Sequence, residues 1–231
     1  MSGRPAEAAP PANAAQETRP VRLDVIDLGT RDYALALDFQ RQMVELRIKG
    51  EIPDTLILVE HPPVLTLGRQ ATQANLLVNE AYLAQQGIGL YRIERGGEVT
   101  YHGPGQIVGY PIISLKERGI SPGAYLRMLE EALIAAIDAY GLKAGRANGF
   151  TGAWVGSEKV AAIGIAVRRW VTYHGFAFNV ESNLAHFDLI VPCGIQGKGV
   201  TSLSRLLGRS VPMAEAQRVI VREFKRVFGY L

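Results

Sequence analysis

The first part of the chain changes from an alternating pattern of apolar and polar residues to a helical one. Residues 21–28 read VRLDVIDL, in which apolar and polar residues alternate for most of the length, as in a half-buried strand. Thr30 can cap a helix from Asp32 to about Lys49, and Gly50 follows its predicted end. We therefore expect order to begin near Val21, with a strand and then a long helix.

Later segments repeat both patterns. Ser121-Pro122 and Gly141 bracket apolar residues at helical spacing, which predicts a second long helix, and Pro212 begins a final helix to about Val227. Apolar runs bounded by turn residues predict short helices at 79–86 and 202–207 and strands at 56–60, 64–67, 90–94, 107–115, 153–156, 160–170 and 173–180. Long helices combined with hairpin-type strands favour an α+β fold over a doubly wound parallel sheet.

Length and composition indicate one globular domain behind a short tail. The 231 residues are 48% hydrophobic and 20% charged, which excludes wholesale disorder. Residues 1–20 are rich in Ala and Pro and lack the apolar core of a secretory signal, so we expect a disordered tail. Residues 21–231 are expected to form a single domain. Because no apolar run approaches the ~20 residues of a membrane-spanning helix, we expect no membrane partner.

Charge is weak overall and concentrated toward the C-terminus. The net charge is +3 and the isoelectric point is near 9.0, which does not call for nucleic acid as a partner. Residues 159–231 contain ten Lys or Arg and four Asp or Glu, a net charge of +6. This part of the chain is either a solvated basic face or a docking surface for an acidic protein.

A glycine-rich segment between two predicted strands is the most unusual stretch. Residues 95–106 read RGGEVTYHGPGQ, which matches neither the GxxxxGK[ST] nor the GxGxxG phosphate-binding pattern. Glycines let a ligand approach the backbone and expose its N–H donors. We therefore expect a ligand-binding loop, with a plain hairpin turn as the structural alternative.

Cys193 is the only cysteine, which excludes an intrachain disulfide and an all-cysteine metal site. It lies in the loop sequence Val191-Pro192-Cys193-Gly194-Ile195 rather than on a periodic apolar face. Such a thiol is either a buried, inert side chain or a nucleophile with a base or cation beside it. Lys159, at the start of an apolar strand, is the candidate neighbour, with an edge charge as the alternative.

The other familiar catalytic patterns find little support. His61, His102, His174 and His186 show neither i, i+4 pairing nor HExxH spacing, so a zinc site is weakly supported. His102 and His174 both occur as Tyr-His-Gly, and each is either a structural histidine or a site residue. The absence of a GxSxG pattern argues against an α/β-hydrolase.

Taken together, these segments resemble the lipoyl(octanoyl) transferases, the LipB family. The resemblance covers residues 22–210 and is carried by the segments 61–68 (HPPVLTLG), 95–106, 148–156 leading into Lys159, 170–180 and 191–194 (VPCG). It implies a mixed β-sheet with flanking helices, related to the catalytic domain of biotin and lipoate protein ligases.

The resemblance also implies a reaction in the cytoplasm, the first step of endogenous lipoate biosynthesis. As an octanoyl-[acyl carrier protein]:protein N-octanoyltransferase, the chain would take octanoyl from the phosphopantetheine thioester of acyl carrier protein. The acceptor would be a specific lysine of apo lipoyl domains, in E2 subunits of 2-oxo acid dehydrogenases and in the glycine cleavage H protein. Cys193 is implied as the nucleophile that forms an octanoyl thioester, and Lys159 as its acid/base partner. Neither ATP nor a metal is implied as a cofactor.

Substrate contacts are implied in three segments: Arg95, Gly96, Gly97, Glu98, Val99, Thr100, Tyr101 and His102; Ala162, Ile163 and Gly164; Gly175, Phe176 and Ala177. Ala162 stands where relatives place Ser, and Phe176 where they commonly have an aliphatic residue. Two alternatives stay open at this point. One is an ATP-dependent lipoate or biotin-type ligase on the same fold, and the other is a non-catalytic acyl-binding module in which Cys193 is inert.

Overall fold

The computed structural model describes residues 22–191 and 199–231. Most strands form one mixed sheet with the order β1-β2-β6-β10-β9-β8-β7, and β11 pairs with β9. β1 runs parallel to β2 and β11 parallel to β9, while the other neighbours are antiparallel. These strands are β1 (Leu23–Thr30), β2 (Asp54–Glu60), β6 (Gln106–Ile112), β7 (Ala144–Ala147), β8 (Phe150–Val155), β9 (Glu158–Arg168), β10 (Val171–Asn179) and β11 (Gly199–Val200).

Three short strands form a second sheet with the order β4-β3-β5. The turn His61-Pro62-Pro63 carries the chain from β2 of the large sheet into β3 of the small one, since prolines cannot continue the hydrogen-bond ladder. Leu65, Leu83 and Tyr101 share the apolar core beneath this sheet. The elements of this region are β3 (Val64–Leu67), η1 (Gln73–Asn75), α2 (Glu80–Gln85), β4 (Gly89–Arg92), β5 (Val99–His102) and η2 (Leu184–Leu189).

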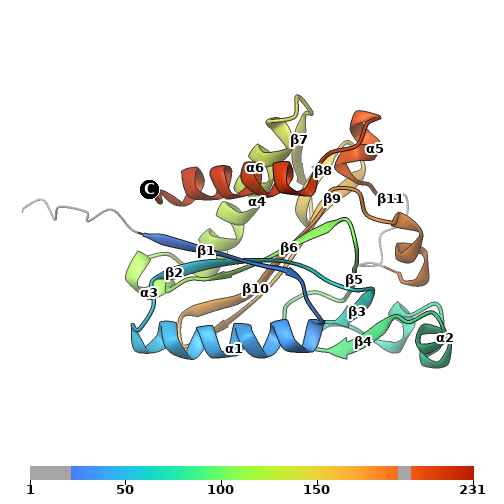
Figure 1. Cartoon of the computed structure of the whole chain (residues 1–231), viewed down its shortest axis with the longest axis horizontal. Coiled ribbons are helices and arrows are strands. Elements are labelled where there is room, and N and C mark those ends of the chain that lie inside the picture. Colours follow the sequence, from blue (N-terminus) through green and yellow to red (C-terminus); the bar gives the residue numbers. More distant parts are fainter. Residues whose placement is uncertain (1–21, 192–198) are drawn as a thin grey trace, which may run out of the picture.

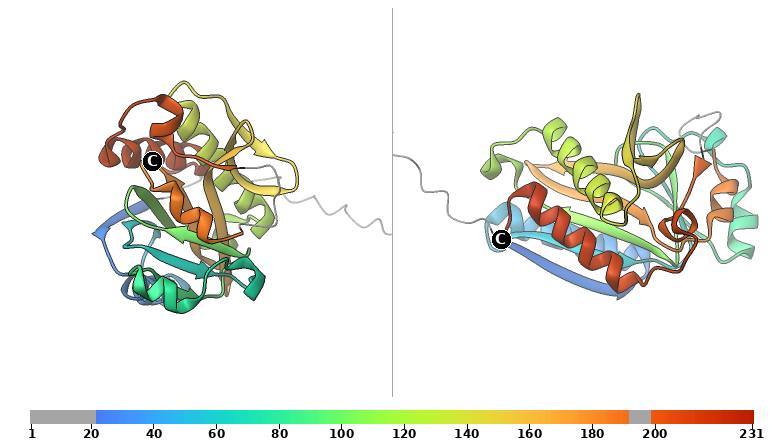
Figure 2. Two further views of the ribbon diagram at one scale, coloured as in Figure 1. Left: turned by 90° about the vertical axis from the view of Figure 1, so that its right-hand side faces the viewer. Right: turned by 90° about the horizontal axis from the view of Figure 1, so that it is seen from above.

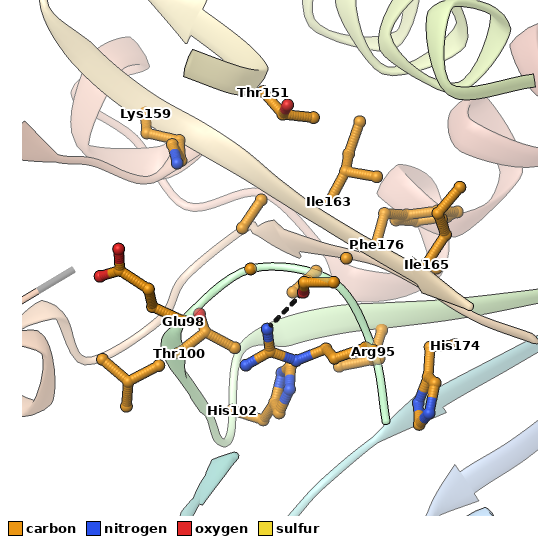
Figure 3. Close-up of a pocket in the computed structure, with 18 of the residues that line it drawn as sticks. Arg95, Glu98, Thr100, His102, Thr151, Lys159, Ile163, Ile165, His174 and Phe176 are labelled. Atoms are coloured by element: carbon orange, nitrogen blue, oxygen red, sulfur yellow. Dashed lines mark hydrogen bonds between the residues drawn. The ribbon is translucent and has the colours of Figure 1, made fainter. Parts of the chain in front are cut away.

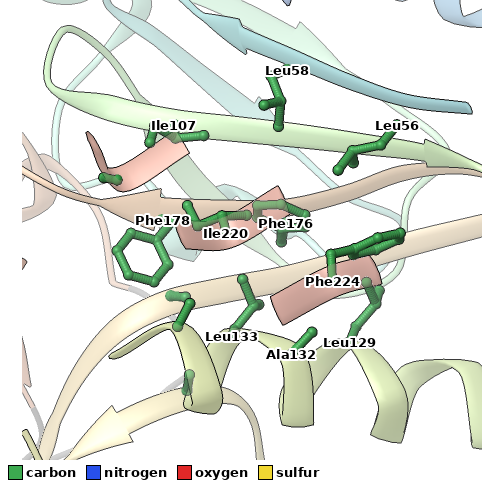
Figure 4. Packing of buried hydrophobic residues seen from close by; sticks show 14 of the residues in the cluster. Leu56, Leu58, Ile107, Leu129, Ala132, Leu133, Phe176, Phe178, Ile220 and Phe224 are labelled. Carbon is green, nitrogen blue, oxygen red and sulfur yellow. The ribbon is translucent and has the colours of Figure 1, made fainter. Parts of the chain in front are cut away.

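Helices cover both faces of the large sheet (Figures 1 and 2). Side chains alternate along β2, so Leu56 and Leu58 join the core under α4 and α6, while Ile57 and Val59 join the core against α1. Figure 4 shows the first of these cores, where Phe176 of β10 lies among residues of both helices. The helices are α1 (Tyr33–Lys49), α3 (Leu115–Arg118), α4 (Pro122–Asp138), α5 (Leu203–Leu207) and α6 (Met213–Phe228).

The α+β prediction is confirmed, whereas three local predictions are wrong. Asp32 caps α1 by accepting a 2.8 Å hydrogen bond from the backbone N–H of Ala34, and Thr30 instead ends β1. The segment 95–106 is not all loop, because it contains β5, where Val99 and its neighbours favour an extended backbone. The predicted strand 107–115 stops at Ile112, since Ser114 caps the short helix α3.

Two predictions concern residues whose structure is not described. Cys193 and the predicted disordered tail, residues 1–20, lie outside the described ranges. A single domain over residues 21–231 therefore stays a prediction. Across residues 22–191 and 199–231, no helix is both long enough and apolar enough to cross a lipid bilayer.

Candidate active site

A cavity of about 490 Å³ opens between the glycine-rich segment and the large sheet (Figure 3). One wall is formed by residues 95–100 and His102, and the other by β9 and β10. β8 and Leu126 of α4 contribute at one side, and Gly199 and Val200 of β11 border it as well. The cavity therefore lies where the two sheets meet.

This cavity brings together Lys159 and the three predicted substrate segments. The predicted residues that line it are Arg95, Gly96, Gly97, Glu98, Val99, Thr100, His102, Lys159, Ala162, Ile163, Gly164, Gly175, Phe176 and Ala177. Tyr101 is not among the lining residues. Side chains alternate along β5, so its ring instead packs in the core of the small sheet, with its centroid 4.7 Å from that of His186.

Arg95 and Gly96 together tie the glycine-rich segment to both sheets. Its guanidinium donates to the backbone oxygen of Thr66 at 2.6 Å and to that of Gly96 at 3.0 Å, while the Gly96 N–H donates to the Ile165 oxygen of β9 at 2.9 Å. A Cβ at Gly164 would lie 2.9 Å from Cδ of Arg95. Gly164 is therefore required for this close approach, which places a rigid polar wall opposite β9.

Lys159 lies at the edge of the cavity on β9. Its Nζ is 4.8 Å from the ring centroid of Trp154, a cation–π contact. Its backbone oxygen accepts from the N–H of Thr201 at 3.0 Å, which fastens β11 beside it. A Cβ at Gly152 would lie 3.5 Å from Cδ and from Cε of Lys159, so the lysine side chain runs directly beside Gly152. A half-buried ammonium held in this way can stabilise a neighbouring anion and exchange protons with it.

Apolar side chains of β9 and β10 line part of the opposite end of the cavity. In Figure 3, Ile163, Ile165 and Phe176 lie together on the side away from Lys159 and Glu98. The Phe176 ring occupies the space that a Cβ of Gly109 would take, so glycine on β6 admits the larger ring. The cavity therefore carries Lys159 and Glu98 at one end, while at the other Ile163, Ile165 and Phe176 offer an acyl chain an apolar surface opposite Arg95.

Two buried histidines in the wall are neutral. Burial, together with nearby His61, lowers the pKa of His102 to about 3, and its Nδ1–H donates to Oε1 of Gln106 at 2.8 Å. Burial lowers the pKa of His174 to about 4 despite Glu94, whose Oε2 lies 4.0 Å from Nε2. His174 has a positive φ of 53°, a backbone conformation unusual for a residue with a side chain. Both Tyr-His-Gly histidines thus belong to the site.

Several lining residues were not predicted as substrate contacts, among them Tyr33, Gln106, Trp154 and Asn179. Gln106 lies in the predicted ligand-binding segment 95–106, whereas Asn179 is a polar residue at the end of an apolar strand, which is the one signal that could have marked it. Tyr33 comes from the start of α1, and its place in the cavity follows only from the packing of that helix on the sheet.

Comparison with known proteins gives concordant results. Residues 32–225 match the family model of the lipoyl protein ligase A/B catalytic domain. The chain is 50% identical over 216 residues to an octanoyltransferase of Rubrobacter xylanophilus, covering 92% of this chain and 97% of that one. The fold is similar to a bipartite lipoate protein ligase of Thermoplasma acidophilum (TM-score 0.71, 15% identity, 91% and 85% covered). It is also similar to a biotin protein ligase of Aquifex aeolicus (TM-score 0.52, 10% identity, 90% and 70% covered).

Proposed function

Since the chain belongs to the lipoyl protein ligase A/B catalytic domain family, and to the octanoyltransferases within it, we propose a reaction through a thioester on Cys193. The chain is an acyltransferase. In this proposal it takes octanoyl from the phosphopantetheine thioester of acyl carrier protein and passes it to a lysine of apo lipoyl domains. E2 subunits of 2-oxo acid dehydrogenases and the glycine cleavage H protein are the proposed acceptors, and the cytoplasm is the proposed compartment.

The observation that carries the proposal is that the two ends of the cavity differ in character. Lys159 marks one end, and Ile163, Ile165 and Phe176 mark the other. The six methylenes of an octanoyl chain, at ~0.8 kcal/mol for each one buried, give a gross stabilisation of about 5 kcal/mol. An octanoyl tail in the apolar end would leave its carbonyl carbon toward Lys159.

In the first step, the Cys193 thiolate attacks the carbonyl carbon of the donor thioester. A new carbon–sulfur bond to Cys193 forms, the bond to pantetheine sulfur breaks, and the Lys159 ammonium protonates the leaving thiolate. In the second step, the neutral acceptor amine attacks the thioester and neutral Lys159 takes its proton. The Cys193 thiolate leaves, so the Cys/Lys pair returns to its starting state.

Two features of the environment would assist these steps. Backbone N–H groups of the glycine-rich segment are the proposed donors to the tetrahedral oxyanion. The thioester must also be kept from water until the acceptor arrives, which a protein substrate covering the cavity would help to do.

The donor is already activated in this scheme, because amide formation from a thioester is downhill. We therefore propose that neither ATP nor a metal takes part. The second candidate, an ATP-dependent lipoate-type ligase, is favoured by the fold alone, which it shares. That ligase would need Lys159 and the cavity but not Cys193.

Intact-protein mass spectrometry distinguishes these reactions. Incubation with octanoyl-acyl carrier protein and no ATP should add one octanoyl group to the wild type, labile to hydroxylamine, and none to Cys193→Ala. Addition of an apo lipoyl domain should then discharge the adduct. The thioester route would be wrong if no adduct formed and the lipoyl domain were modified only with free octanoate and ATP. If neither modification occurred, the acyl-binding module would remain.

A further inference from the structure

Two buried asparagines bond to residues on either side of the segment that carries Cys193. The described chain stops at Val191 and resumes at Gly199. Asn75, in η1, contacts Val191, and Asn179, at the end of β10, contacts Thr201. Both asparagines are more than nine-tenths buried. Neither asparagine was predicted from the sequence as a site residue. Each amide uses both its donor and its acceptor atoms, so each side chain is held in place by its neighbours.

Asn75 fixes the residue before this segment. Its Nδ2 donates to the backbone oxygen of Val191 at 3.3 Å, and its own backbone oxygen accepts from the Val191 N–H at 3.0 Å. The same Nδ2 donates to Oε2 of Glu98 at 2.8 Å, and Oδ1 accepts from the N–H of Thr72 at 2.7 Å. Val191 is thereby linked to Glu98 in the cavity wall.

Asn179 fixes the other side. Its Nδ2 donates to the backbone oxygen of Thr201 at 3.1 Å, while Oδ1 accepts from Nε2 of Gln106 at 2.8 Å and from Ser182 at 3.1 Å. The N–H of Thr201 in turn donates to the backbone oxygen of Lys159. Thr201 is therefore held between Asn179 and the strand of the proposed acid/base residue.

Both contacts lead back to the glycine-rich segment, through Glu98 near its start and Gln106 at its end. We propose that Asn75 and Asn179 are positioning residues: they fix Val191 and Thr201, described residues on either side of Cys193, and thereby set the distance between the Cys193 thiol and Lys159 during the reaction. This inference rests on the proposed function, in which Cys193 is the nucleophile. The physical reason is distance, because the stabilisation of a thiolate by an ammonium weakens as their separation grows.

Alkylation by iodoacetamide tests the inference directly, because Cys193 is the only thiol in the chain. The rate is measured against pH for the wild type, Lys159→Ala, Asn75→Ala and Asn179→Ala. Each asparagine variant should raise the midpoint of alkylation by about one pH unit, equivalent to about tenfold less thiolate at neutral pH. In the Lys159→Ala background the same substitutions should cause no further shift.

Asn79→Ala is the matched control. Asn79 lies four positions after Asn75, is exposed, and caps α2 through the N–H of Tyr82, with no hydrogen bond to Val191 or Thr201 among the described contacts, so its truncation should leave the midpoint unchanged. Thermal unfolding checks that the variants are folded. If Asn75→Ala loses its fold, Asn75→Ser replaces it, since the hydroxyl can still accept from Thr72 but cannot reach both Glu98 and Val191.

The outcomes separate this inference from the function on which it rests. If Lys159→Ala raises the midpoint and neither asparagine variant does, the positioning role is wrong and the Cys/Lys pair stands. If the asparagine variants shift the midpoint equally with and without Lys159, they do not act through Lys159 and the inference is again overturned. If Lys159→Ala leaves the midpoint of alkylation unchanged, both the proposed Cys193–Lys159 pair and the positioning role are wrong.

Discussion

Two clusters centred on buried polar residues lie at different ends of the large sheet. One pairs opposite charges, and the other keeps its titratable groups neutral. Figure 1 places α3 and the C-terminus at one end, and β3 and β5, beside the cavity, at the other. The first cluster centres on Asp54 of β2. Its Oδ1 accepts from Nε of Arg47 at 2.9 Å and its Oδ2 from the hydroxyl of Tyr230 at 2.8 Å. Arg47 also forms a two-pronged bond to Glu117, at 2.8 and 2.6 Å.

The cluster around Asp54 balances charge against charge, with Asp54 and Glu117 facing Arg47 and Arg118. The pKa of Glu117 is lowered, chiefly by its hydrogen bond to Arg47. The cavity cluster instead presents His102 and His174 as neutral rings, with their pKa values lowered by burial. The first cluster joins α1, β2, α3 and the C-terminus to one another and lies outside the active-site cavity, whereas the second lines that cavity. The paired groups around Asp54 therefore hold elements of the fold together, and the polar groups of the cavity are available to a ligand.

The largest expected effect is at Lys159. Lys159→Ala should lower octanoyl transfer by about a thousandfold or more, because both proton transfers lose their mediator. The free energy of unfolding should change by about 1 kcal/mol or less, since the side chain is only half-buried. Transfer is followed with purified donor and acceptor proteins, and unfolding with urea.

Lys159→Arg sharpens this test. It keeps a cation above Trp154, but a guanidinium does not give up its proton, so transfer should remain low while thiol alkylation stays close to that of the wild type. Substantial transfer by the arginine variant would show that Lys159 supplies charge and not protons.

Asp54→Ala should have the opposite profile. It leaves Arg47 and Tyr230 without their shared partner in a buried site, which should cost about 3–5 kcal/mol of unfolding free energy. Transfer per folded molecule should stay near the wild-type value, because the cluster does not touch the cavity. Urea unfolding and activity normalised to titrated active protein are measured together. A loss of normalised activity would show that the two clusters are coupled.

His102 and His174 of the cavity cluster should make stability depend on pH, together with His61 beside His102, whose pKa burial also lowers. In the unfolded chain a histidine titrates near 6.5, but the lowered pKa values keep His174 neutral in the folded chain down to about pH 4 and His102 to about pH 3. Between these values the unfolded chain binds more protons, so stability falls as the pH drops below about 6.5. Each histidine should account for about 2 kcal/mol lost by pH 5.

His174→Gln and His102→Gln should each flatten the fall in unfolding free energy between pH 7 and pH 5, as measured by urea titration at fixed ionic strength. The double variant should flatten it further. A curve that keeps its full slope in both single variants would mean that other groups carry the acid sensitivity.

The same contrast explains how much of the molecule could be predicted from its sequence. Arg95, Ala162 and Gly175 line the cavity and belong to short sequence motifs. The sequence predicted them because each motif resembles the corresponding segment of a known family. Asp54, Glu117 and Tyr230 are far apart in sequence and follow no pattern, because only the packing of α1, α3 and the C-terminus brings them together. Tyr101 was included with its motif although strand alternation turns its ring away. Asn75 was missed because its partner, Val191, lies far along the chain.

The smallest expected effect concerns the basic face predicted near the C-terminus. Arg218, Arg222 and Arg226 are exposed along α6 at four-residue spacing, and Arg222 and Arg226 share the carboxylate of Glu223 at 2.8 and 2.7 Å. Glu223 offsets part of the charge of this row, which stays positive. Reversal of all three arginines to Glu should weaken binding of an acidic carrier protein by about threefold to tenfold and reduce its salt dependence, because exposed charges contribute little each.

Binding is measured by titration at two salt concentrations, with the matched reversal of the exposed Arg22, Arg168 and Arg169 as control. The control carries the same change in net charge, placed elsewhere on the surface. Equal losses in both triple variants would show that the carrier protein responds to net charge and not to α6. A loss confined to the α6 variant would add a third kind of polar region to the two buried clusters, one whose charge is exposed because its partner is another protein.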